Sequence, residues 1–121
     1  MKEKKSLIVI EDEFNLRYLL TELFIDKGIP REQVISAADG AEALRLLKKY
    51  DVKVISLDIK MPGMDGIEFL YNFDKAQHNK VVIFSAYVDH RLNEYPKVKF
   101  ILNKPEDHSK FFDTVLELAN A

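Results

Sequence analysis

Five polar side chains follow short apolar runs of this 121-residue sequence, each where a buried strand would end. Glu11 and Asp12 follow the first run, and Asp58 follows the third. Ser85 and Lys104 follow the fourth and the fifth. If folding brings the ends of these runs together, three carboxylates, a hydroxyl and an ammonium group meet in one cleft. Three carboxylates in one cleft repel each other, so either one stays protonated or a cation neutralises the group.

These groups suit a divalent cation and a phosphoryl group. The candidate ligands are all oxygens, which hard cations prefer, and Mg²⁺ fits best because it needs few protein ligands. Lys104 offers a positive charge for a phosphate and Ser85 offers a hydroxyl donor. Asp58 is the candidate nucleophile, because a carboxylate can accept a phosphoryl group and its strand is expected to be central. Such a transfer depends mainly on positioning and charge neutralisation.

Each of these residues also has an ordinary structural interpretation. Residues 11–13 could form an acidic helix N-terminus, and a single Asp after a strand is usually a solvated loop residue. Ser85 alone indicates nothing, and Lys104-Pro105 alone is a loop before a helix. Only their joint placement at successive strand ends favours the functional interpretation.

An α/β pattern explains how these residues could meet. Continuous apolar runs, several rich in Val and Ile, indicate strands buried on both faces of a parallel sheet. The runs span residues 7–10, 34–38, 52–57, 81–84 and 98–102. Segments with helical period separate them, and right-handed crossovers place helices on both faces of the sheet. In such open sheets, ligands bind at the carboxyl ends of the strands.

The helix signals vary in strength along the chain. Gly28 is placed to end the first helix, and Asp39–Glu42 and Asp65–Glu68 have the spacing of capping boxes. The fourth helix is expected to be weak, because Pro96 ends it after about two turns. Its shared face is formed by Val88, Leu92 and Tyr95. The N-terminal lysines are expected to form a solvated tail, and surface positions are expected for His78, His90 and His108.

Composition indicates one ordinary globular domain over residues 1–121. Apolar residues make up 47% and charged residues 31%, and the formal charge of −2 gives no basic excess for direct nucleic-acid binding. Cysteine is absent, which excludes disulfides, thiol catalysis and cysteine-based zinc sites. The first apolar run is too short for a signal peptide and none approaches a membrane span, so we expect a cytoplasmic protein without membrane contact.

Four segments together resemble the receiver domain of bacterial two-component response regulators, the chemotaxis-regulator-like fold. They are residues 7–13 (LIVIEDE), residues 58–66 (DIKMPGMDG), Ser85-Ala86 and Lys104-Pro105. The resemblance covers essentially the whole chain and is most specific between Asp58 and Gly66. It implies an α/β, flavodoxin-like (βα)5 three-layer sandwich with five parallel strands in the order 2-1-3-4-5.

The resemblance implies a phosphorylated aspartate with Mg²⁺ beside it. Asp58 would accept the phosphoryl group from a histidine kinase or a histidine phosphotransferase. Asp12, Asp58 and the backbone carbonyl of Lys60 would bind Mg²⁺, and Glu11 would act through a metal-bound water. Glutamate at position 11, where relatives often carry aspartate, is a variation that should not abolish metal binding.

Other family positions imply contacts to the phosphoryl group. Ser85 would hydrogen-bond a phosphoryl oxygen, the backbone of Ala86 would line the phosphate loop, and Lys104 would pair with the phosphate. Lys104-Pro105 is usually a cis peptide in relatives, which proline permits.

Three further positions carry expectations about lifetime and switching. Lys60 and Tyr87 flank the phosphoryl group in receivers, and this pair is similar to single-domain phosphorelay receivers of the sporulation type. A ring over the acyl phosphate would hinder attack by water, although Tyr87 could equally be a partly buried surface aromatic. At the switch position, where relatives carry Tyr or Phe, this chain has Ile101, and strand alternation turns Phe100 to the other face.

The resemblance predicts a signalling switch rather than an enzyme. Such a chain accepts a phosphoryl group, assists its own phosphorylation and dephosphorylation, and biases a surface that binds a downstream protein. We expect no effector domain after Ala121, although a piece of a longer protein would leave the same trace. Two alternatives remain open: a hydrolase with an aspartyl-phosphate intermediate, which usually has an acid where Lys60 stands, and an unphosphorylated interaction module on the same fold.

Overall fold

One parallel sheet forms the centre of the molecule. The structure is a computed structural model that describes residues 1–87 and 89–121. The strands are β1 (Glu3–Ile10), β2 (Val34–Ala37), β3 (Tyr50–Leu57), β4 (Val81–Ser85) and β5 (Phe100–Asn103). All adjacent pairs are parallel, and the spatial order is β2-β1-β3-β4-β5. The expected five-stranded sheet in the order 2-1-3-4-5 is confirmed.

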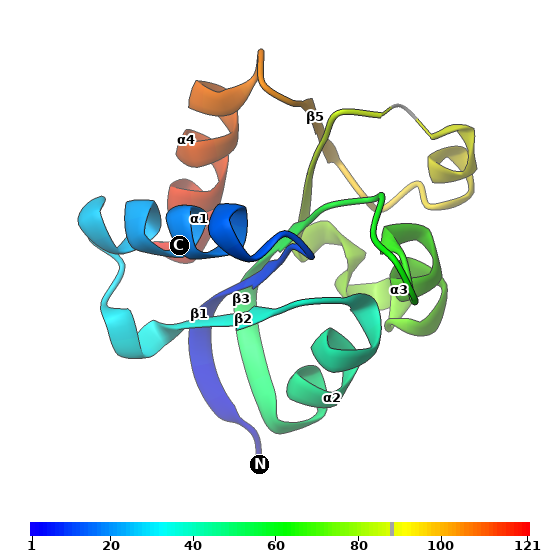
Figure 1. The fold of residues 1–121 in the computed structure, drawn as a ribbon. Helices are drawn as coiled ribbons and strands as arrows, with labels where there is room; N and C mark the ends of the chain where they lie inside the picture. Colours follow the sequence, from blue (N-terminus) through cyan, green and yellow to red (C-terminus); the bar gives the residue numbers. More distant parts are fainter. Residues whose placement is uncertain (88) are drawn as a thin grey trace.

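Helices cover both faces of the sheet (Figure 1). The α-helices are α1 (Phe14–Asp26), α2 (Gly40–Lys49), α3 (Gly66–Asn72) and α4 (His108–Ala119). The 3-10 segments are η1 (Arg31–Gln33), η2 (Lys75–Lys80) and η3 (His90–Glu94). α1 and α4 lie on one face, and α2 and α3 lie on the other, so the molecule has three layers. Within the described residues, no helix combines the length and apolar character that a membrane crossing requires.

Strand alternation divides the core between the two faces. Leu7 and Val9 of β1 pack with α1 and α4, whereas Ile8 and Ile10 pack with α2 and α3. All four side chains are buried. Because both faces of a central strand need apolar side chains, the strand appears in the sequence as a continuous apolar run.

Local signals set several helix ends as predicted. Gly28, just beyond α1, has φ +115°, a conformation that glycine adopts without steric cost. Asp65 and Glu68 form the expected reciprocal capping box at the start of α3. Asp39 accepts from the Glu42 amide, but the Glu42 carboxylate turns to the amide of Ala38. In the predicted box at the start of α2, the Glu42 side chain therefore bonds to the amide one residue before the N-cap.

Three expectations about the elements are wrong. The N-terminal lysines are not a free tail, because β1 begins at Glu3 and pairs with β3 from Tyr50 onward. The last strand begins two residues later than predicted, at Phe100. The fourth crossover contains only the five-residue η3 within its described part, because a segment so close to Pro96 is too short for a stable α-helix. Of the three residues predicted to share a face, Leu92 and Tyr95 are buried, and Val88 lies outside the described residues.

His78 is a core residue, not a surface residue. Its side chain is 1% exposed, and its Nε2 lies 3.1 Å from the Leu70 carbonyl and 3.2 Å from the Phe73 carbonyl. Both partners are acceptors, so Nε2 carries a proton and donates to the C-terminal end of α3. The Leu70 carbonyl also accepts from the Phe73 amide at 3.3 Å, and His78 adds a further donor where α3 ends.

Candidate functional site

Backbone hydrogen bonds beyond the strand ends position the predicted site residues. The Asp58 amide donates to the Ile10 carbonyl at 3.2 Å, and the Glu11 amide donates to the Ala37 carbonyl at 3.1 Å. The Lys104 amide donates to the Ser85 carbonyl at 3.0 Å. Each bond continues the pairing of two adjacent strands by one residue. The sheet register therefore fixes the backbone from which these side chains extend.

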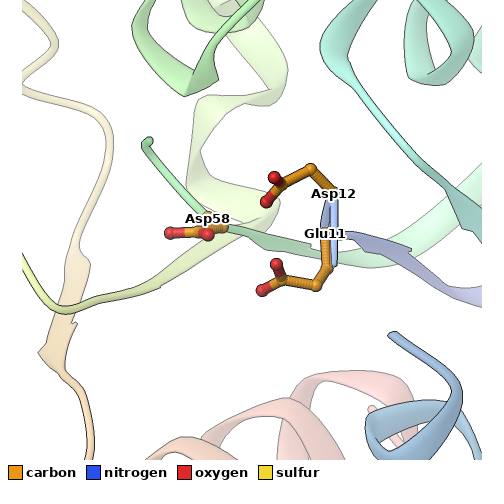
Figure 2. A group of neighbouring side chains, drawn as sticks. All are labelled: Glu11, Asp12 and Asp58. Atoms are coloured by element: carbon orange, nitrogen blue, oxygen red, sulfur yellow. The ribbon is translucent and has the colours of Figure 1, made fainter. Parts of the chain in front are cut away.

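Three carboxylates meet at this end of the sheet. Glu11, Asp12 and Asp58 each offer an oxygen, and these oxygens all lie within 4.8 Å of one another. Figure 2 shows the Glu11 and Asp12 side chains extending to the same side, towards Asp58. Glu11 is only 3% exposed. An all-oxygen group at this spacing has the chemistry of a site for a hard divalent cation.

Lys104 supplies the positive charge next to these acids. Its Nζ lies 3.0 Å from Glu11 Oε1 and 3.7 Å from Asp58 Oδ2. The second Glu11 oxygen, Oε2, accepts from the Glu13 amide at 3.2 Å. The ammonium group is thus held more closely by the glutamate than by the aspartate. It balances only part of the charge of three ionised carboxylates.

Burial shifts the acids towards their protonated forms. The pKa of Asp58 is raised by burial, with Lys104, the Ile59 amide and Ser85 opposing the shift and Asp12 adding to it. The pKa of Glu11 is also raised, mainly by burial, against the hydrogen bond and charge of Lys104. A buried carboxylate loses hydration that one nearby ammonium group restores only in part. A cation bound here would stabilise the ionised carboxylates and so compensate for the hydration that they lose on burial.

The turn after β4 faces the loop after β3. Ser85 is 1% exposed, and its Oγ accepts from the Tyr87 amide at 3.3 Å. The Lys60 ammonium lies 4.5 Å from the centre of the Tyr87 ring, a cation–π contact, while the ring remains 55% exposed. Ala86, between Ser85 and Tyr87, is exposed. Lys60, two residues after Asp58, and Tyr87, two residues after Ser85, are therefore in contact.

Ile101 lies on the opposite face of β5 from Phe100. Phe100 packs with the α1–α4 side of the core, whereas Ile101 is 45% exposed. The predicted alternation is confirmed. Lys104-Pro105, just beyond β5, is a cis peptide.

Arg17 is a site neighbour that the sequence analysis did not select. Its Nη1 donates to the Glu11 carbonyl at 2.7 Å and to the Asp12 carbonyl at 3.2 Å. The available signal was its spacing, since an arginine in the first turns of a helix can reach back to the residues that precede the helix.

This arrangement of acids, hydroxyl and lysine occurs in a chain that matches a known protein family. The family model of the response regulator receiver domain matches residues 7–115. The chain belongs to the response regulator receiver family. Receiver domains have a phosphoryl-accepting role in two-component signalling, and neither the hydrolase nor the unphosphorylated module is favoured by this match.

Two curated relatives resemble this receiver domain to different extents. It is 38% identical over 88 residues to the sporulation initiation phosphotransferase F of Bacillus subtilis, covering 72% of this chain and 67% of that protein. It is 30% identical over 121 residues to protein MrkE of Klebsiella pneumoniae, covering 98% of this chain but 45% of that protein. The receiver domain thus spans less than half of the second relative.

Solved receiver structures have the same fold. Response regulator TrrA from Thermotoga maritima, determined in complex with Mg²⁺-BeF, has a TM-score of 0.78 and 26% identity. That comparison covers 94% of this chain and 98% of TrrA. The receiver domain of the Francisella response regulator 1452 has a TM-score of 0.77 and 28% identity, covering 98% of each chain.

Proposed function

We propose that Asp58 is the phosphoryl acceptor of this receiver domain. The donor is a phosphohistidine on a histidine kinase or a histidine phosphotransferase. The observation that carries the proposal is the group formed by Asp58, two further carboxylates and Lys104 at the end of the sheet. The similarity to a sporulation phosphotransferase supports a phosphorelay partner of the same chemical kind.

The transfer moves one phosphoryl group between two side chains. An Asp58 carboxylate oxygen attacks the phosphorus atom and forms a P–O bond, while the P–N bond to the donor histidine breaks. The released imidazole nitrogen keeps the electron pair of that bond and takes a proton from solvent. Asp58 must be ionised to attack, so its raised pKa disfavours reaction until its charge is balanced.

Glu11, Asp12 and Asp58 would hold Mg²⁺, with the backbone carbonyl of Lys60 as a further ligand. Their oxygens match the donors this cation prefers, and Glu11 would contribute through water. When bound, Mg²⁺ neutralises charge on the carboxylates and on the phosphoryl oxygens. It would also compete with Lys104 for Glu11.

Ser85, Ala86 and Lys104 would bind the phosphoryl oxygens. The Ser85 hydroxyl at the end of β4 and the Ala86 amide just beyond it are donors, and Lys104 Nζ lies 3.7 Å from Asp58 Oδ2. Each can donate to an oxygen that carries more negative charge during transfer. The chain in this way assists its own phosphorylation and dephosphorylation without turning over a separate substrate.

Lys60 and Tyr87 would set the lifetime of the phosphoryl group. Their cation–π contact holds the tyrosine ring against Lys60, two residues after the acceptor, from where it would obstruct the approach of water to the phosphoryl group. Ile101 occupies the switch position and would respond without a swinging aromatic ring. The changed surface would then bind a downstream protein partner.

A mass measurement tests the acceptor. After incubation with a small phosphodonor and Mg²⁺, we expect the wild type to gain the mass of one phosphoryl group. Asp58→Asn should gain none. Asp39→Asn is the matched control, because Asp39 is an aspartate that follows another strand of the same sheet and caps α2. An adduct on Asp58→Asn, or none on the wild type, would overturn the proposal.

A further inference from the structure

Arg17 fastens the backbone that carries two of the three acids. One guanidinium nitrogen donates to two successive carbonyls, those of Glu11 and Asp12. Within residues 1–87 and 89–121, no other donor bonds to either carbonyl. The amide side of Glu11 is fixed separately by the Ala37 carbonyl of β2. The turn between β1 and α1 is therefore held from the sheet on one side and from α1 on the other.

The position of Arg17 in α1 explains its reach. It is half-buried and lies one turn inside the helix, whose N-cap Glu13 accepts from the amides of Asn15 and Leu16. Helical side chains lean towards the N-terminus, so an arginine here extends over the preceding turn. The Phe14 ring, three residues earlier, lies 5.5 Å from the guanidinium carbon and supports it.

We propose that Arg17 is a positioning residue for the metal site, acting through the Glu11 and Asp12 backbone rather than through contact with the metal. The inference rests on the proposed Mg²⁺ site. A cation site gains affinity when its carboxylates are already held at the required spacing. Here that spacing depends on a turn whose two carbonyls share one donor.

Charge and positioning make opposite predictions. If Arg17 acted only as a nearby positive charge, it would repel a divalent cation, and its removal would tighten Mg²⁺ binding. If it holds the turn, its removal lets Glu11 and Asp12 move apart and weakens binding. The direction of the change therefore separates the two roles.

The test is the Mg²⁺ dissociation constant, measured by calorimetric titration of the whole chain. We expect Arg17→Met to raise it about tenfold, within the range for residues that orient metal ligands. Arg17→Lys keeps the charge and a donor, so its dissociation constant should fall between those of the wild type and Arg17→Met. Arg45→Met is the charge-matched control, because Arg45 is an exposed arginine on α2, and it should match the wild type.

A second readout reports the turn itself. Without metal, amide hydrogen exchange at residues 11–13 should accelerate in Arg17→Met, while amides inside β1 and β3 keep their protection. If Arg17→Met does not fold, the shorter, uncharged Arg17→Gln carries the same expectation. An unchanged or lower dissociation constant in a folded variant would overturn the inference. A wild type that binds no Mg²⁺ would instead overturn the proposed metal site, and this inference with it.

Discussion

Residues 1–58 and residues 81–107 meet at the same end of the sheet but are built differently. The first region carries all three acids just beyond the ends of β1 and β3, strands of eight residues each, with α1 and α2 packed beside them. The second carries Ser85 at the end of β4 and Lys104 just beyond β5, strands of five and four residues. Its described crossover contains only η3.

This difference suggests a division of work. The acid side has the longer ladders and the buried Glu11, so it provides a fixed site. The β4–β5 side leaves Tyr87 and Ile101 about half exposed, and fewer backbone bonds and buried contacts hold it in place. We expect a phosphoryl group to move the second region relative to the first.

A large effect is expected at Gly66, where the loop after β3 closes against the backbone of Asp58 and Ile59. A Cβ there would lie 2.6 Å from the Asp58 carbonyl oxygen and 2.7 Å from the Ile59 Cα. Gly66→Ala should cost about 3 kcal/mol of unfolding free energy, the upper end for overpacking. Gly63→Ala is the control, since its φ of 70° is strained but its Cβ meets nothing within 4 Å. It should cost about 1 kcal/mol. If denaturant unfolding gave equal losses of unfolding free energy for Gly66→Ala and Gly63→Ala, the loop after β3 would not be rigidly packed against the acid region.

A matched leucine pair compares the two regions directly. Leu20 on α1 and Leu92 on η3 are 5% and 6% exposed. Leu20→Ala should cost about 3–4 kcal/mol, because long helices cannot close around the cavity. Leu92→Ala should cost about 2 kcal/mol, because a five-residue 3-10 segment can collapse inward. If urea unfolding showed a larger loss of unfolding free energy for Leu92→Ala than for Leu20→Ala, the second region would be the more rigid one.

The raised pKa values of Glu11 and Asp58 predict a pH dependence on the acid side. The folded state binds protons more readily than the unfolded state, so metal-free stability should fall as pH rises from about 4 through the raised values. Ionised acids bind metal, so Mg²⁺ affinity should rise over the same window. Asp58→Asn should weaken both trends, and it should be more stable than the wild type without metal near neutral pH. Denaturation and Mg²⁺ titration across a pH series measure this, and flat wild-type profiles would disprove it.

The smallest expected effect is at Tyr87. Because its ring is 55% exposed, it can shield the phosphoryl group only in part. Tyr87→Ala should speed phosphate loss by about threefold, since it removes an obstacle to water. Tyr71→Ala, at an exposed tyrosine on α3, should leave the rate unchanged. An unchanged rate in Tyr87→Ala would refute the shielding hypothesis.

The strand ends were predictable because the signal is local and strong. Apolar runs such as residues 7–10 end directly at polar residues, and parallel topology brings those ends together. The gathering of Glu11, Asp12 and Asp58 followed from that rule alone.

The misses depend on tertiary contacts that spacing does not encode. His78 lies in a polar stretch, and its burial depends on the carbonyls at the end of α3 and on the Phe73 and Tyr95 rings beside it. Arg17 was missed because its partners are backbone atoms, which have no sequence signature. The N-terminal lysines have the sequence pattern of a solvated tail because their side chains are polar. Backbone pairing with β3 holds them in a strand, and such pairing leaves no signal in the side-chain pattern.

The most direct test is the rate at which a small phosphodonor labels the wild type as Mg²⁺ is varied, with the labelled peptide identified by mass spectrometry. We expect a saturable dependence on Mg²⁺, loss of labelling with a chelator, and a phosphoryl group on the peptide that contains Asp58. Labelling that proceeds equally without Mg²⁺, or that lies on a peptide without Asp58, would contradict a site in which the gathered acids and a cation let this aspartate accept phosphorus.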